Sequence, residues 1–144
     1  MNAVVWVHHD ALSRDHPVFA EAGEGARAVF VWDADDIARR GWTLKRCVFV
    51  MECVDAMSVE VVEGRYVDVL GGMEADRLLM ADTPDPAFRA VADGLGVDVV
   101  RVPGRPLTDV PATTDMGRFF RFWNKARRSA LMPTAELPRP DPLP

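Results

Sequence analysis

The chain has 144 residues, of which 49% are apolar, 27% charged and only 8% aromatic. This length and composition suit one soluble globular domain and leave no room for two full domains. No run of about eighteen apolar residues occurs, and residues 1–6 lack the basic start of a signal peptide. We therefore expect a cytoplasmic protein with no membrane span.

The net charge of −5 is unevenly distributed along the chain. Residues 1–117 carry 20 Asp and Glu against 11 Lys and Arg, whereas residues 118–144 carry 6 basic side chains against 2 acidic ones. An acidic surface repels the phosphate backbone of nucleic acids. The charge distribution therefore disfavours direct DNA binding, except through the basic C-terminal segment.

The two cysteines, Cys47 and Cys53, are six residues apart within one predicted helix. Side chains at this spacing point away from each other, so we expect two free thiols. Neither cysteine has a histidine or another cysteine at metal-ligand spacing, and no metal site is expected.

Five short apolar runs predict buried β-strands. They are rich in β-branched and aromatic residues, as strands covered on both faces usually are. The runs are residues 4–7, 28–32, 67–70, 78–81 and 97–102.

Helical patterns separate the predicted strands. The first helix follows Asp15, a candidate N-cap, with Pro17 in its first turn. The strongest pattern covers residues 43–57, and another starts near Thr83 or Asp85 and ends before Gly96 at the C′ position. The apolar face expected for the helix at 43–57 consists of Leu44, Cys47, Val48, Met51, Val54 and Met57.

This alternation predicts an α/β fold: an open five-stranded parallel, Rossmann-like sheet in the order 3-2-1-4-5, with helices on both faces. The link between residues 70 and 78 conflicts with this topology, because parallel neighbours need a longer crossover. Either residues 73–77 extend that connection or the strand boundaries there are misplaced.

A final helix is expected over residues 114–131. Its aromatic side chains Phe119, Phe120, Phe122 and Trp123 share one arc, and the opposite face is basic. Proline-rich residues 133–144 predict an extended tail. We therefore expect an α/β domain over 1–113, an amphipathic helix within 114–132 and a tail over 133–144.

Polar side chains follow three of the predicted strands and would gather at the carboxyl edge of the sheet, where open α/β folds bind ligands. His8, His9 and Asp10 follow the first strand, Asp33 the second and Asp82 the fourth. Such aspartates also cap helices and form turns. A histidine here could act as a general base, but no nucleophile or phosphate-binding loop accompanies it.

Several segments resemble the N-terminal α/β domain of the DNA photolyase/cryptochrome family. Residues 6–17, W-V-H-H-D-A-L-S-R-D-H-P, are similar to the family's opening W-F-R-x-D-L-R-x-x-D-N-P. Residues 29–33 are similar to its second strand, and residues 79–84 lie where the family has a turn after strand four. Arg46, Phe49 and Glu52 resemble its R-x-x-F-x-x-E helix, and residues 119–123 its F-T-x-F-W stretch.

The resemblance implies a domain that binds a second, antenna chromophore such as a folate, a deazaflavin or a flavin. The family's FAD site belongs to a downstream helical domain that this chain lacks, so catalysis by this chain alone is not expected. Matched residue by residue, the chromophore-binding positions are His8, His9, Asp10, Trp32, Asp33, Ala34, Arg46, Phe49, Ala81, Asp82 and Asp85.

Three functional hypotheses follow. The first is a non-catalytic module that binds an antenna chromophore or nucleotide-like ligand at the switch point of the sheet. The second is an interaction subunit whose aromatic residues Phe119, Phe120, Phe122 and Trp123 dock on a separate FAD-binding helical protein, completing a split photolyase, or mediate self-association. The third is a nucleotide-handling enzyme with His8 or His9 as base.

Overall fold

The computed structural model describes residues 2–111 and 117–132, and the chain divides into two compact units at residues 104 and 105. The first unit is an α/β sheet structure, and the second contains the C-terminal helix. The predicted tail over 133–144 and the predicted helix start near residue 114 lie outside the described residues.

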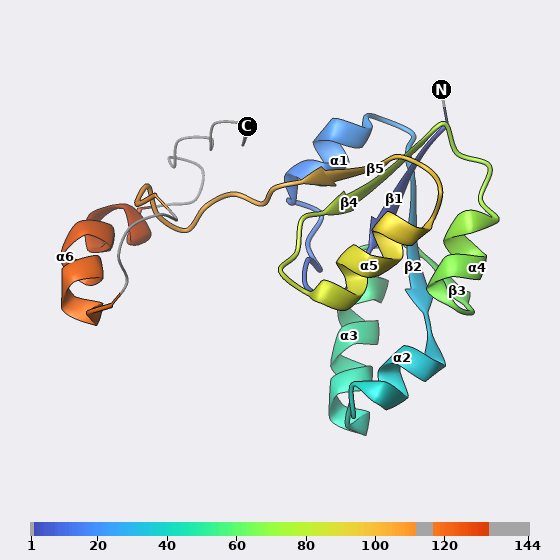
Figure 1. Cartoon of the computed structure of the whole chain (residues 1–144), viewed down its shortest axis with the longest axis horizontal. Helices are drawn as coiled ribbons and strands as arrows, with labels where there is room; N and C mark the ends of the chain where they lie inside the picture. Colours follow the sequence, from blue (N-terminus) through green and yellow to red (C-terminus); the bar gives the residue numbers. More distant parts are fainter. Residues whose placement is uncertain (1, 112–116, 133–144) are drawn as a thin grey trace. The chain divides into compact units, whose positions relative to one another are not determined.

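The first unit is built on a five-stranded, all-parallel sheet in the predicted order, β3-β2-β1-β4-β5 (Figure 1). Its strands are β1 (Ala3–Val7), β2 (Arg27–Trp32), β3 (Glu60–Glu63), β4 (Arg77–Ala81) and β5 (Val99–Val102). The central strand pairs Val5 with Ala28 on one side and with Leu79 on the other. The strand order reverses between β1 and β4, which places the expected switch point between these two strands.

Helices cover both faces of the sheet because its strands alternate two sets of apolar side chains. Val5 and Val7 face α1 (Pro17–Ala22) and α3 (Leu44–Ala56). Val4 and Trp6 face α4 (Tyr66–Gly71) and α5 (Pro86–Gly94). These two layers of packing bury the central strand completely, since Val5 and Trp6 are each 0% exposed.

The third strand is not where the sequence pattern placed it. Residues 67–70 form α4, whose Leu70 is buried at helical spacing from Tyr66 and Met73, and the strand is Glu60–Glu63. Only Val62 of this strand is even partly buried, so the edge strand carries almost no apolar signal. With the strand moved, residues 64–76 form the β3–β4 connection, which is long enough for a parallel crossover.

Two smaller expectations about helices α1 and α3 were also wrong. The N-cap of α1 is His16 rather than Asp15, because the His16 imidazole accepts a hydrogen bond from the Val18 amide at 3.2 Å. On α3, Leu44 and Val48 point to solvent, and Val50 joins Val54 and Met57 in the core instead. The helix α5 agrees with expectation, with Asp85 as N-cap and Gly96 at φ 69° beyond its end.

A short helix that the sequence pattern did not reveal, α2 (Ala34–Arg39), follows β2 directly (Figure 1). Its signals were present: Asp33 as N-cap, Asp35 and Asp36 in the first turn and Arg39 in the last. It is only six residues long and mostly polar, so its sequence has no apolar periodicity that would predict a helix.

The second unit contains α6 (Phe119–Ala130), the aromatic and basic helix that the sequence predicts. Its buried side chains, Ala126 and Ser129, lie toward its C-terminal end. There the Ser129 hydroxyl donates a hydrogen bond to the Asp109 carboxylate at 2.5 Å, which fixes residues 108–110 against the helix.

The different positions of two leucines give a direct test of the fold. Leu79→Ala should lower the free energy of unfolding by about 2–5 kcal/mol, because Leu79 is fully buried in the sheet. Leu44→Ala should change it by less than about 0.5 kcal/mol, because Leu44 is 79% exposed. Urea denaturation of both variants measures the difference, and equal losses would show that α3 is wrongly oriented.

Candidate functional site

The turns after β1 and β4 meet at the carboxyl edge of the sheet, as the predicted topology requires. The Nε2 atom of His8 lies 2.9 Å from the carbonyl oxygen of Ala81. The Thr83 hydroxyl donates to the Asp10 carboxylate at 2.5 Å. These two contacts hold the ends of the neighbouring strands together and form one wall of the candidate site.

The turn after β2 is fixed to the same edge by Asp33, which is buried. Its carboxylate accepts hydrogen bonds from the Asp36 amide and from the Tyr66 amide, both at 3.1 Å. The first bond caps α2 and the second holds the start of α4. Asp33 therefore has a structural role here, and Ala34, the first residue of α2, is exposed.

Arg40 joins the turns after β2 and β4. Its Nε donates to Asp36 and its Nη1 to Asp85, each at 2.6 Å, while the guanidinium lies 4.7 Å from the centre of the Phe88 ring. Burial disfavours the charged guanidinium, but the hydrogen bonds to Asp85 and Asp36 outweigh it and raise the pKa of Arg40. A charged side chain thus spans the switch point of the sheet.

The carboxylate of Asp36 is the buried anchor of this arrangement, because its side chain is only 3% exposed. It also pairs with Arg39 and accepts a hydrogen bond from the Tyr66 hydroxyl at 3.1 Å. Burial and the negative charge of Asp36 both raise the pKa of Tyr66, so this hydroxyl stays a donor at neutral pH. With three donors, the buried carboxylate is well satisfied.

An aromatic stack closes the same edge of the sheet beside α3. The His9 and Trp42 rings are stacked, with their centres 4.9 Å apart and an angle of 24° between their planes. The Arg46 guanidinium carbon lies 5.2 Å from the centre of the Trp42 ring. Gly41, at φ 64°, ends α2 and turns the chain so that Trp42 reaches His9. The stack is therefore built from two loops that the sheet brings together.

Two nitrogen atoms at this edge, His9 Nδ1 and Arg40 Nη2, are buried and have no hydrogen-bond partner among the described residues. The His9 side chain is 7% exposed, and its Nδ1 is 3.7 Å from Asp10, which is too long for a hydrogen bond. Buried polar atoms are rarely left unsatisfied. Both atoms therefore have hydrogen-bonding capacity that the described residues do not use.

Both histidines at the site are neutral at pH 7. Burial lowers the pKa of His9, and the charges of Arg40 and Arg46 lower it further against the opposing effect of Asp10. Burial also lowers the pKa of His8, whose ring packs 4.9 Å from Phe88. A neutral imidazole can accept one hydrogen bond and donate another.

The remaining predicted positions are distributed differently. Asp82 binds Arg89 at 3.0 Å, and Asp85 caps α5 while binding Arg40. Phe49 lies on α3 and is 58% exposed. Trp32 is half-buried and packs against the core cluster shared with α1 and α3.

Five residues that sequence reasoning did not assign to the site belong to it. Their roles depend on contacts between distant segments, which no local pattern encodes; only the Asp36–Arg40 pair, four apart on one helix face, carries a local signal. These residues are Asp36, Arg40, Trp42, Tyr66 and Thr83.

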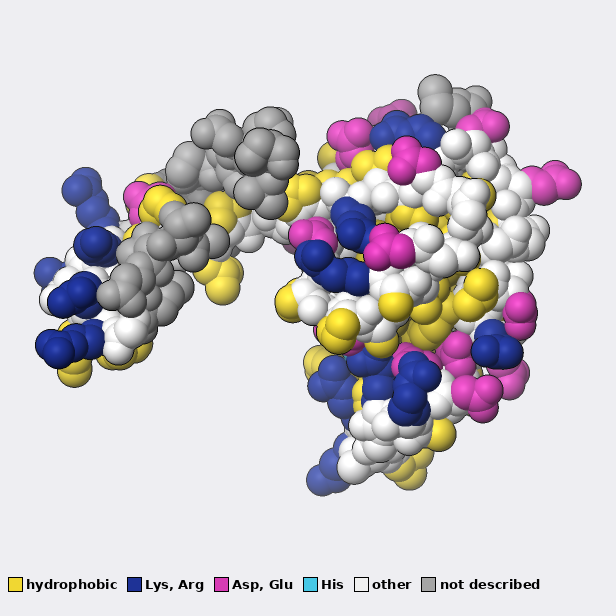
Figure 2. Space-filling view, in the orientation of Figure 1, with side chains coloured by type: hydrophobic (Ala, Val, Ile, Leu, Met, Phe, Trp, Pro, Cys, Tyr) yellow, Lys and Arg dark blue, Asp and Glu magenta, His cyan; other side chains and the backbone are white. Residues whose placement is uncertain are grey.

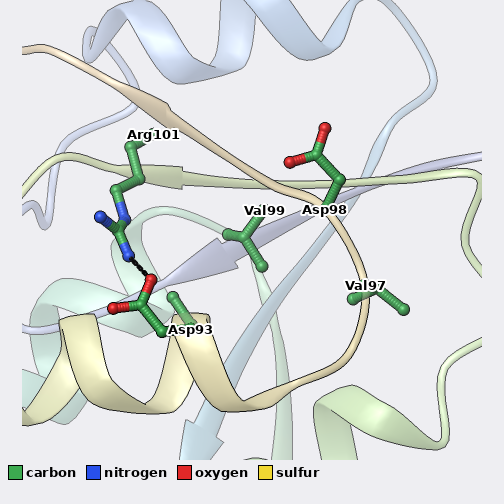
Figure 3. Close-up of a pocket in the computed structure, with 6 residues that line it drawn as sticks. Asp93, Val97, Asp98, Val99 and Arg101 are labelled. Carbon is green, nitrogen blue, oxygen red and sulfur yellow. Dashed lines mark hydrogen bonds and ion pairs between the residues drawn. The ribbon is translucent and has the colours of Figure 1, made fainter.

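The surface hollows found on the described residues lie away from this edge. One of about 400 Å³ lies between α5 and β5, where Arg101 pairs with Asp93 beside Val97, Asp98 and Val99 (Figure 3). Because residues 97 and 98 lead into β5, it lies toward the amino ends of the strands. It therefore does not extend the candidate site.

Within residues 2–111 and 117–132, no group of three or more His, Cys, Asp and Glu side chains is placed to hold a metal ion. No helix in the described part of the chain is long and apolar enough to cross a membrane. No protein-family model matches the chain, and no curated protein matches it.

Removal of the Arg40 side chain should destabilise the folded protein. Arg40→Ala leaves the buried Asp36 with one cation fewer and should lower the free energy of unfolding by about 3 kcal/mol. Arg39→Ala is the matched control, because Arg39 pairs with the same carboxylate but is 69% exposed, and it should cost about 1 kcal/mol or less. Equal effects in chemical denaturation would contradict this role for Arg40.

Acidification should destabilise the protein through its histidines. Burial lowers the pKa of His8, His9 and His16 below 6.5, so the unfolded chain binds more protons than the folded one as the pH falls through 6.5. The free energy of unfolding should then decrease, with a limiting slope of about 1.4 kcal/mol per pH unit for each histidine. His8→Gln should reduce this slope in denaturation curves between pH 7.5 and 5, and an unchanged slope would contradict the assignment.

Proposed function

We propose that this chain is a binding module for a planar, aromatic, hydrogen-bonding ligand at the carboxyl edge of β1, β2 and β4. The observation that carries the proposal is the pair of buried, unpartnered nitrogens, His9 Nδ1 and Arg40 Nη2, at one topological switch point. Both belong to side chains that other contacts hold in place, as a preorganised site requires.

The chemistry of the site favours a heteroaromatic ring. The His9 and Trp42 stack provides a flat apolar surface, to which Arg46 adds a cation. Neutral His9 can exchange one hydrogen bond with a ring N–H or ring nitrogen, and Arg40 Nη2 can donate only to an acceptor such as a carbonyl oxygen. Flavins, deazaflavins and folates combine these features, and they are the chromophores that the sequence resemblance implies.

Binding of such a ligand requires a local rearrangement. The unpartnered nitrogens are covered, and Trp42 stacks directly on His9. Trp42 lies in the loop between α2 and α3, next to Gly41, so a rotation of the indole is the smallest movement that would uncover His9. The ligand ring would then take the place of the indole or insert beside it.

A role for the module in a photolyase-type system rests on the sequence resemblance alone. An antenna domain needs to hold a planar chromophore rigidly, with apolar walls and a few oriented polar groups. The site proposed here has this character. DNA repair and the identity of the chromophore are therefore proposals that follow only if the ligand is one of these pigments.

Ligand titration tests the proposed function. Freshly purified protein should show visible or near-ultraviolet absorption from a retained chromophore, or should bind added FMN, 8-hydroxy-5-deazaflavin or 5,10-methenyltetrahydrofolate. Trp42→Ala should weaken binding about tenfold, the effect of losing one aromatic stacking contact. Trp123→Ala, on α6, is the matched control and should bind as tightly as the unmodified chain.

A colourless protein that binds none of the three probes would contradict the proposal. So would equal binding by the Trp42→Ala variant, provided that its circular dichroism spectrum shows a folded chain. Binding that weakens in Trp123→Ala instead would place the ligand on the second unit.

A further inference from the structure

The first turn of α6 carries an aromatic surface without a covering partner among the described residues of its unit. Phe119 and Phe120 are 64% and 73% exposed. The Phe119 and Trp123 rings are stacked, with their centres 6.1 Å apart and an angle of 10° between their planes. The Phe119 and Phe120 rings are arranged edge to face, with their centres 5.4 Å apart. We call these three residues the aromatic turn. Phenyl rings as exposed as those of Phe119 and Phe120 are typical of a protein–protein contact, and the Trp123 ring beside them is half-buried.

The other end of α6 holds its own unit together. Ser129 and Ala126 are buried, and the Ser129 hydroxyl lies 2.8 Å from the Thr108 hydroxyl and 2.5 Å from the Asp109 carboxylate. These contacts use the C-terminal half of the helix. Phe119 and Phe120 lie at the opposite end of the helix and take no part in these contacts.

An apolar hollow of about 470 Å³ lies on the outer side of α3. Cys47, Val48 and Met51 line it, with Glu52 and Asp55 at the same surface. The neighbouring side chains Leu44 and Phe49 are also largely exposed. We call this surface the α3 hollow. Leu44 and Val48 are the residues of this surface that the sequence pattern assigned to the core and that the fold leaves exposed, whereas Met51 is half-buried against the core.

The charges of the two surfaces are complementary. The helix α6 carries Arg121, Lys125, Arg127 and Arg128 and no acidic residue, and these cations gather on it in Figure 2. Of the five residues that line the hollow, Glu52 and Asp55 are acidic and none is basic, and Lys45 lies one turn earlier on the same helix. An aromatic contact surrounded by opposite charges is a common composition for an interface.

We propose that the aromatic turn of one molecule docks in the α3 hollow of a second copy of this chain. Each copy carries both surfaces, so a two-fold symmetric dimer would bury two such contacts. The phenyl rings would fill the apolar floor, and Lys125 and Arg127 would approach Glu52 and Asp55. The ligand site at the carboxyl edge takes no part in this contact, so the dimer does not depend on the proposed function.

Sedimentation equilibrium of the full chain tests the proposal. The protein should be a concentration-dependent dimer whose dissociation constant rises with ionic strength. Phe120→Asp and Val48→Asp, one on each surface, should each raise that constant at least about tenfold. Val67→Asp is the matched control for Val48, because Val67 is exposed to a similar degree, 46% against 48%, and should leave it unchanged.

A charge-reversal experiment distinguishes this specific contact from nonspecific association. Asp55→Lys and Lys125→Asp should each weaken the dimer, and the chain that carries both substitutions should recover most of the affinity. Circular dichroism of each variant verifies folding, and both positions lie on exposed helix faces.

Three results would overturn the proposal. The first is a monomer at all concentrations, which includes docking of α6 within its own chain. The second is a dimer that neither Phe120→Asp nor Val48→Asp weakens. The third is an aromatic turn that binds only a separate FAD-binding helical protein while the chain itself stays monomeric.

Discussion

The carboxyl edge of this sheet depends on one buried carboxylate, Asp36, and the arginine that binds it. Parallel strands alone would leave the turns after β2 and β4 apart, since β1 lies between them. Arg40 bridges that gap by binding Asp36 on one side and Asp85 on the other, over the ring of Phe88. Because Asp36 is almost fully buried, removing Arg40 would leave a buried charge with too few partners and would cost far more than breaking a surface ion pair.

This bridge also determines which polar groups the candidate site contains. Two of the three guanidinium nitrogens of Arg40, Nε and Nη1, donate to carboxylates, and the third, Nη2, is buried without a partner among the described residues. His9 is held between Trp42 and Phe88 and kept neutral by burial and by nearby guanidiniums. The edge therefore holds one unpartnered donor, one unpartnered imidazole nitrogen and an aromatic stack, which a movement of Trp42 would uncover.

The fold could be predicted from sequence because its signal is strong and local. Runs such as residues 4–7 and 28–32 are apolar on both faces, which is characteristic of central parallel strands. The edge strand Glu60–Glu63 was not predicted, because an edge strand buries few side chains and so has a weak apolar pattern. Residues 67–70 were predicted as a strand, because a short helix with one buried face can have the same apolar run as a strand. The predicted strand order was nevertheless correct, because β3 still lies between β2 and β4 along the chain and keeps its number in the order 3-2-1-4-5.

The candidate site was only half predictable for a related reason. Topology alone brings His8, His9, Asp10, Asp33 and Asp82 to one edge, so these positions could be named in advance. The contacts that give the edge its chemistry join residues far apart in the chain, such as Asp36 with Tyr66 and His9 with Trp42. The position of Trp42 depends on the turn at Gly41, and that of Tyr66 depends on a helix whose sequence was predicted to form a strand.

The most direct test of the ligand site is the ¹⁵N NMR signal of the His9 imidazole with and without FMN. A ligand that forms a hydrogen bond with Nδ1 should shift the ring nitrogen resonances of His9 and move the indole signal of Trp42, while the indole signal of Trp123 stays in place. Unchanged His9 and Trp42 signals at saturating FMN, deazaflavin and folate would contradict a binding site at this edge.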